Sequence, residues 1–325
     1  TKKFLESFKI SMIRKAIIIS IKGLKLSSKE KTLLSKEKPW GLILFKRNIK
    51  SLIQTKALIK SIRNCVKDKK FPILIDEEGS KVSRLRSIIS HNINANYFGN
   101  LYKINKRHAV NLYKNYLRSL SSILKEIGIN VNTIPVLDIL RHNTSSVIDN
   151  RSFSENKKIV KELGRITIKE CHVKKIISVI KHIPGHGCTN VDSHLSTPKV
   201  NLSKKNLDKI DFYPFKSSPA KLAMTAHILY TKIDPKNIST FSKKIIKEII
   251  RNKIGYKGIL MSDDISMKAL KYDLVTNAKK SLSAGCNLVL YCAGNIKDNF
   301  KLIKSVPYID KFTIKKTSEI YKILR

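Results

Sequence analysis

Eight short apolar runs recur along the chain, separated by longer segments with apolar residues at helical spacing. Most runs are bounded by Gly, Pro, Asp, Asn or Lys, as is typical of buried parallel strands. The runs span residues 16–21, 41–45, 71–75, 131–137, 176–180, 222–226, 258–261 and 287–291. Eight strands alternating with helices in 325 residues predict an α/β fold, a single (β/α)8 barrel of the TIM type.

A doubly wound open sheet is the alternative for such an alternation. That fold carries a glycine-rich phosphate turn after its first strand, and the sequence offers only Gly23 there. The chain has no internal repeat, low-complexity linker or break in composition. We therefore expect residues 1–325 to form one catalytic barrel domain.

The charge of the chain raises the question of a nucleic-acid partner. With 65 Lys and Arg against 24 Asp and Glu, the formal net charge is +41. The lysines occur in every stretch, without an arginine-rich arm or a basic block interleaved with aromatic residues. We expect salt-sensitive adhesion to polyanions but no specific nucleic-acid binding.

Cysteine usage and apolar run length indicate the compartment. The five cysteines are scattered and include no CxxC pair, which favours reduced thiols in a cytoplasm. The apolar runs are far too short to cross a bilayer, so no membrane insertion is expected. A secretory signal is not expected either, because no small-residue cleavage site follows the first apolar run.

Ionisable residues follow most of the predicted strands. In a (β/α)8 barrel, catalytic groups lie at the C-terminal ends of the strands. Six of the eight runs lead into such groups, namely Lys46-Arg47-Asn48, Asp76-Glu77-Glu78, Asp138, Lys181-His182, His227 and Asp263-Asp264. The strand entrances carry little besides Lys, Gly, Asn or an aromatic residue, so this polarity predicts an enzyme.

The segment from Lys181 to His194 is the densest in histidine. Asp192 and His194 are two residues apart, so in an extended loop both side chains project to the same side. A carboxylate beside an imidazole fixes its tautomer and raises its basicity, as a general acid/base requires. Two alternatives remain open, namely loop capping and a metal site made of His182, His186, Cys188, Asp192 and His194.

Asp263 and Asp264 end the seventh run. Neighbours on an extended strand point to opposite sides, so one carboxylate faces the barrel mouth and the other packs outward. A carboxylate at the mouth suits a nucleophile or an oxocarbenium stabiliser. The alternative is that either residue caps a helix running through Met267 and Leu270. We expect Asp263 to perform chemistry and Asp264 to be structural.

These segments together resemble bacterial β-N-acetylglucosaminidases of glycoside hydrolase family 3, of the cell-wall recycling type. The His/Asp loop is similar to that family's KH(F/I)PGHG…DSH signature, and the resemblance extends over almost the whole chain. The other matching segments are Gly41–Asn48, Ile75–Gly79 with Arg84, Pro135–Asp138, Arg151–Phe153, Met224–His227 and Ser262–Asp264.

The resemblance implies a retaining exo-β-N-acetylglucosaminidase without metal or organic cofactor. In that family's mechanism Asp263 is the nucleophile and His194 the acid/base, oriented by Asp192. The sugar-binding positions of the family correspond to Asp76, Arg84, Arg151, Lys181 and His182. The expected substrate is an N-acetylglucosamine-containing muropeptide, and the expected oligomeric state is a monomer.

The chain departs from the family pattern in the segment after Asp76. Glu77 stands in place of a glutamine, Ser80 of a second glycine and Lys81 of an arginine, and Asn287 replaces a common aspartate. Two other functions stay open. One is a substrate-assisted hexosaminidase that uses Asp263 and Asp264 as paired carboxylates; the other is a non-enzymatic polyanion-binding protein.

Overall fold

The computed structural model describes residues 13–141, 144, 148–189 and 196–325. Eight strands of this part form a closed parallel barrel in the order β1-β10-β9-β7-β5-β4-β3-β2. They are β1 (Lys15–Ile19), β2 (Pro39–Leu44), β3 (Ile73–Ile75), β4 (Val131–Asn132), β5 (Ile177–Ile183), β7 (Leu222–Thr225), β9 (Ile259–Asp264) and β10 (Leu288–Leu290). Each overlaps one of the eight apolar runs, and the predicted (β/α)8 barrel is confirmed.

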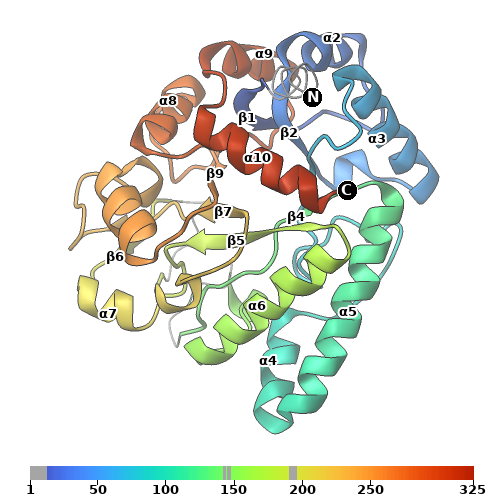
Figure 1. Cartoon of the computed structure of the whole chain (residues 1–325). Coiled ribbons are helices and arrows are strands. Elements are labelled where there is room, and N and C mark those ends of the chain that lie inside the picture. The colour runs from blue at the N-terminus through green and yellow to red at the C-terminus, as the bar shows by residue number, and fades with distance from the viewer. Residues whose placement is uncertain (1–12, 142–143, 145–147, 190–195) are drawn as a thin grey trace.

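Helices follow the strands and surround the barrel (Figure 1). They are α2 (Ser28–Glu37), α3 (Leu52–Val66), α4 (Ala95–Ile104), α5 (Lys106–Ile127), α6 (Lys157–Val173), α7 (Lys204–Lys209), a π-helix (Ile245–Lys253), α8 (Leu274–Ala284), α9 (Ile296–Ser305) and α10 (Lys311–Ile323). Outside the barrel, β6 (Lys199–Val200) pairs in parallel with β8 (Leu229–Tyr230). No helix in the described ranges has the length and apolar character needed to span a bilayer.

Local sequence signals set the helix ends. Ser27 caps α2 with a capping box to Glu30, in which each side chain satisfies a backbone NH at the helix start. Asn94 and Asn105 cap α4 and α5 through a single bond each, in which the side chain accepts a backbone NH three residues on. Helix α5 is capped at its C-terminal end by Gly128, whose φ of 100° lies in the left-handed region that glycine adopts readily.

The N-terminal end of the barrel is closed by α10, which crosses in front of the strands in Figure 1. Residues at the starts of the strands, among them Ala16 and Trp40, pack with Ile320 and Tyr321 of α10 in one apolar cluster. The indole Nε1 of Trp40 donates a hydrogen bond of 2.9 Å to Thr317 Oγ1. This end of the barrel is therefore a packed core.

Three strands end three or more residues away from the end that the sequence predicts. β4 stops at Asn132, short of the predicted residue 137, because the segment that follows contains Pro135, which has no NH to donate to a ladder. β5 and β9 instead run past their apolar runs, to Ile183 and Asp264. The polar residues at these two ends are thus part of the strands, which holds them more rigidly than a loop would.

Candidate active site

A pocket of about 600 Å³ opens at the C-terminal end of the barrel. Every predicted site residue that the structure describes lines it: Asp76, Arg84, Arg151, Lys181, His182 and Asp263. Glu78, Val82, Ile148, His186, Met224, Leu290 and Cys292 complete the wall.

Asp76 follows β3 and accepts contacts from two cations. Arg84 Nη2 lies 3.2 Å from its Oδ2, and Lys181 Nζ lies 3.4 Å from its Oδ1, to which the Thr133 hydroxyl also donates. Burial by itself raises the pKa of Asp76, but Lys181, Arg84 and Thr133 outweigh it and hold the pKa far below its usual value. Asp76 is therefore an ionised acceptor suited to sugar hydroxyls.

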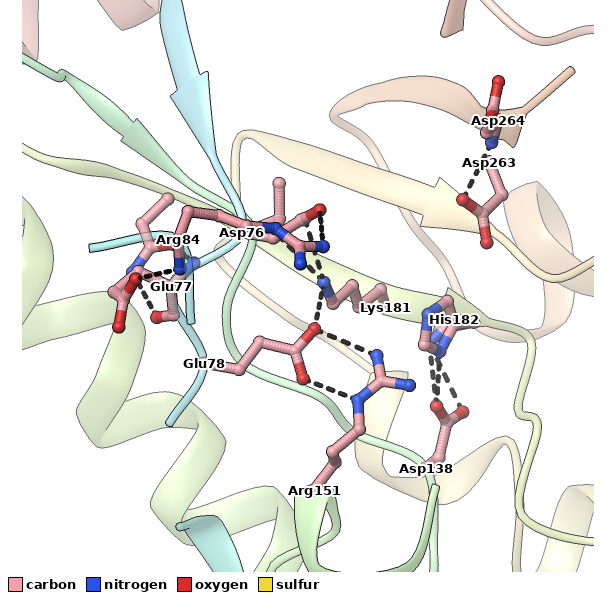
Figure 2. A network of polar contacts seen from close by, with 12 residues as sticks. Asp76, Glu77, Glu78, Arg84, Asp138, Arg151, Lys181, His182, Asp263 and Asp264 are labelled. Carbon is pink, nitrogen blue, oxygen red and sulfur yellow. Dashed lines mark hydrogen bonds and ion pairs between the residues drawn. The ribbon is translucent and has the colours of Figure 1, made fainter. Parts of the chain in front are cut away.

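Glu78 forms a second ion-pair cluster in the same wall, shown with the first in Figure 2. Arg151 binds it through two nitrogens, with Nε–Oε2 at 2.6 Å and Nη2–Oε1 at 2.9 Å, and Lys181 Nζ lies 2.5 Å from Oε1. Burial raises the pKa of Glu78, but Arg151 and Lys181 lower it to about 2. Lys181 thus bridges the carboxylates of Asp76 and Glu78.

Glu78 was not among the predicted site residues. The signal was present, because Asp76 and Glu78 are two residues apart at a strand end and extended neighbours of that spacing share a side. The ion-pair partners of Glu78 could not be predicted from the sequence in the same way. Arg151 lies 73 positions further along the chain, and no local pattern connects it to Glu78.

The imidazole of His182 pairs with the carboxylate of Asp138 (Figure 2). Its Nδ1 lies 2.6 Å from Asp138 Oδ2, and Asp138 Oδ1 accepts the backbone NH of His186 at 2.6 Å. Burial raises the pKa of Asp138, but His182 and the His186 backbone lower it below its usual value. Nε2 of His182 makes no hydrogen bond within the described residues, so Asp138 presents this nitrogen to a ligand. Asp138, noted after the fourth run, was not predicted to have this role.

Asp263 and Asp264 point to opposite sides of β9 (Figure 2). Asp263 lines the pocket, and its Oδ1 accepts the Asp264 NH at 2.8 Å. Burial raises the pKa of Asp263, but nearby His182, His227 and the Asp264 NH outweigh it and lower the pKa. An ionised carboxylate therefore faces the pocket from the wall opposite Asp76.

The carboxylate of Asp264 is used within the protein. Its Oδ2 accepts the Ser266 hydroxyl at 2.7 Å, and its Oδ1 accepts the Cys292 NH at 3.1 Å. Burial and the neighbouring Asp263 raise its pKa. The alternative that Asp263 or Asp264 caps a helix through residues 267–270 is wrong, because turns follow β9 and the next helix begins at Leu274, capped by Asp273.

His227 supports this strand end from β7. Its Nδ1 lies 2.7 Å from Thr240 Oγ1, and its Nε2 lies 3.1 Å from the carbonyl oxygen of Asp264. Burial lowers the pKa of this imidazole. With both ring nitrogens occupied, His227 fixes the backbone at Asp264 beside the pocket.

The predicted acid/base pair, Asp192 and His194, lies outside the described residues. Of the described positions of the metal alternative, His182 pairs with Asp138 and His186 makes a local hydrogen bond. His186 Nδ1 lies 2.8 Å from Thr189 Oγ1, and burial lowers the pKa of His186 to about 4. Within the described ranges, no three His, Cys, Asp or Glu side chains gather in a way that could hold a metal ion.

A parallel barrel whose C-terminal pocket combines ionised carboxylates with Arg, Lys and His donors has the features of a barrel glycoside hydrolase. Comparison with known proteins agrees. Residues 8–318 match the family model described as the glycosyl hydrolase family 3 N-terminal domain. The chain belongs to this family.

Related proteins show which group of this family the chain resembles. A β-hexosaminidase of Haemophilus influenzae is 34% identical over 304 residues, covering 90% of this chain and 85% of that protein. One from Nitrosomonas eutropha is 32% identical, covering 85% of this chain and 80% of that protein. The crystal structure of NagZ from Neisseria gonorrhoeae with N-trifluoroacetyl-D-glucosamine has a TM-score of 0.85 and 28% identity, covering 95% of this chain and 90% of that one. The chain is a glycoside hydrolase of the bacterial β-N-acetylhexosaminidase group.

Proposed function

We propose that this protein is a retaining exo-β-N-acetylglucosaminidase that forms a covalent glycosyl-enzyme on Asp263. The observation that carries the proposal is the state of Asp263: ionised, fixed by the Asp264 NH and facing the pocket. In the first step Asp263 attacks the anomeric carbon while His194, oriented by Asp192, protonates the leaving oxygen. In the second step the same imidazole deprotonates water, which releases the sugar with its original configuration.

The sugar is held by the groups opposite Asp263. Asp76 accepts hydroxyl hydrogens, and Arg84, Arg151, Lys181 and His182 donate to hydroxyl and carbonyl oxygens. Arg84 Nε supports this role, because it is buried and has no hydrogen-bond partner within the described residues. A donor left in this state favours a ligand that completes its hydrogen bonding.

The contacts of Asp264 favour the covalent route over a substrate-assisted one. A substrate-assisted mechanism needs a second carboxylate to orient the 2-acetamido group of the sugar. Asp264 instead points away from the pocket and bonds to Ser266 and Cys292. Asp263 is therefore the carboxylate of this pair that is available to the sugar.

The wider setting follows from the resemblance and the charge. We propose a muropeptide carrying terminal N-acetylglucosamine as the substrate and the cytoplasm as the location. The barrel acts as one monomeric catalytic domain, without cofactor. A surface of net charge +41 attracts the carboxylates of such a substrate.

The deciding experiment measures fluorophore release from a β-N-acetylglucosaminide in the presence of EDTA, for the parent protein and Asp263→Asn. We expect activity in the parent and none in the variant. A 2-fluoro sugar with a good leaving group should add one sugar mass to the intact parent protein. Hydrolysis without a trapped adduct would favour the substrate-assisted route. Polyanion binding without hydrolysis would contradict the enzymatic proposal.

A further inference from the structure

Glu77 is a fully buried carboxylate between two pocket residues, and it points away from the pocket. Its Oε2 accepts two backbone NH groups, that of Arg84 at 2.7 Å and that of Leu85 at 3.0 Å. Its own backbone is held on both sides by the Asn132 side chain, through bonds of 3.0 and 2.9 Å. Glu77 therefore joins the rigid end of β3 and β4 to the segment that carries Arg84.

The other oxygen of Glu77 faces His91, at 3.2 Å from Nε2. Within the described part of the chain, His91 is the side-chain partner of this oxygen, and its ring packs edge-on against Tyr116 with the ring centroids 5.8 Å apart. Removing a carboxylate from water is costly unless hydrogen bonds and a partner compensate. Two NH groups and one imidazole thus keep the Glu77 carboxylate in place.

Arg84 depends on this arrangement for its position. Its guanidinium lies 3.2 Å from Asp76 Oδ2 and 5.3 Å from the centroid of the Phe45 ring. Neither contact holds the backbone from which the side chain extends, and the Glu77 carboxylate does. A shift of this backbone displaces the Nε–H that the sugar would use.

We propose that Glu77 and His91 are a positioning pair that sets the place of Arg84 for sugar binding. This inference rests on the proposed function, in which Arg84 binds the sugar. Glu77 touches neither substrate nor reacting atoms and acts through the backbone of Arg84. The pair therefore governs affinity for the N-acetylglucosaminide more than the rate of the chemical step.

A double-mutant cycle tests this inference with a fluorogenic β-N-acetylglucosaminide. The variants are Glu77→Ala, Arg84→Ala and the two combined, each measured for KM and kcat. We expect Glu77→Ala to raise KM about tenfold with a smaller change in kcat, because a binding contact is lost. In the Arg84→Ala background the same substitution should change KM less than about twofold, since residues that act through one contact are not additive.

Two further variants separate positioning from folding. Glu77→Gln keeps an oxygen for the two NH groups and should restore KM to within about threefold of the parent. Should Glu77→Ala fail to fold, His91→Ala replaces it in the cycle, since its side chain lies partly at the surface. Glu170→Ala is the matched control, because that buried carboxylate pairs with Arg118 on the outer helices and should leave KM unchanged.

Two results would overturn the positioning pair. One is a rise in KM of equal size with and without Arg84; the other is an unchanged KM in Glu77→Ala and His91→Ala. Failure of the proposed function gives a different pattern, an unchanged KM in Arg84→Ala or full activity in Asp263→Asn.

Discussion

The two ends of the barrel are built from the same strands in opposite ways. At the N-terminal end, Trp40 and Ile320 pack in an apolar cluster beneath α10. At the C-terminal end, Glu78, Arg151 and Lys181 are nearly buried and charged. Apolar burial stabilises the first end directly, whereas the second depends on every charge keeping its partner. Substitutions should therefore affect stability at one end and both stability and catalysis at the other.

The largest effect is expected at Asp263. Asp263→Asn removes the proposed nucleophile and should lower kcat by about 10⁴-fold, with little change in secondary structure. Steady-state hydrolysis and circular dichroism measure the two effects. Asp264→Asn is the matched variant and should cost less activity, because Asp264 bonds within the protein. Equal losses in both variants would contradict the division of roles along β9.

The second effect concerns the buried ion pairs. Glu78→Ala removes the carboxylate that binds Arg151 and Lys181 and should lower the free energy of unfolding by about 3–5 kcal/mol. Urea denaturation measures this free energy of unfolding for the variant and the parent. Glu126→Ala, which breaks the exposed pair with Lys56, should cause no measurable change. If both variants unfold at the same urea concentration as the parent, the charges of the pocket do not contribute to stability.

The third effect is the pH dependence of that cluster. The pKa of Glu78 is lowered from 4.5 to about 2 in the folded state, so its ionised form favours folding. The resulting stability is fully present above pH 4.5 and is lost as the pH falls towards 2. Unfolding free energies measured through this range should fall less steeply in Glu78→Gln than in the parent. Parallel curves would show that another group accounts for the acid sensitivity.

The smallest effect belongs to the N-terminal end. Trp40→Phe removes the hydrogen bond to Thr317 and leaves a small cavity, at a cost of about 1–2 kcal/mol. Thermal unfolding should show the loss, while kcat/KM should stay at the parent value. A fall in kcat/KM below the unfolding temperature would mean that the two ends are coupled.

The sequence predicted the barrel because each strand is a short apolar run, a signal that needs no partner. The positions of Asp76 and Asp263 were predictable for the same reason, since Asp76 directly follows such a run and Asp263 follows one after a single residue. The last residues of β5 and β9 could not be predicted in this way. Lys181, His182 and Asp263 are polar, and they belong to the strands because the neighbouring strands pair with them. The same holds for Asp138, whose contact with His182 joins residues 44 positions apart.

The pairing of β1 with β10 has a consequence for how the chain folds. Ile17 pairs with Val289, so β1 cannot gain this neighbour until β10 has been synthesised. The apolar cluster at the strand entrances waits longer, because α10 follows β10. On the ribosome, these surfaces remain open until α10 emerges, so the barrel closes only after all eight strands have been synthesised.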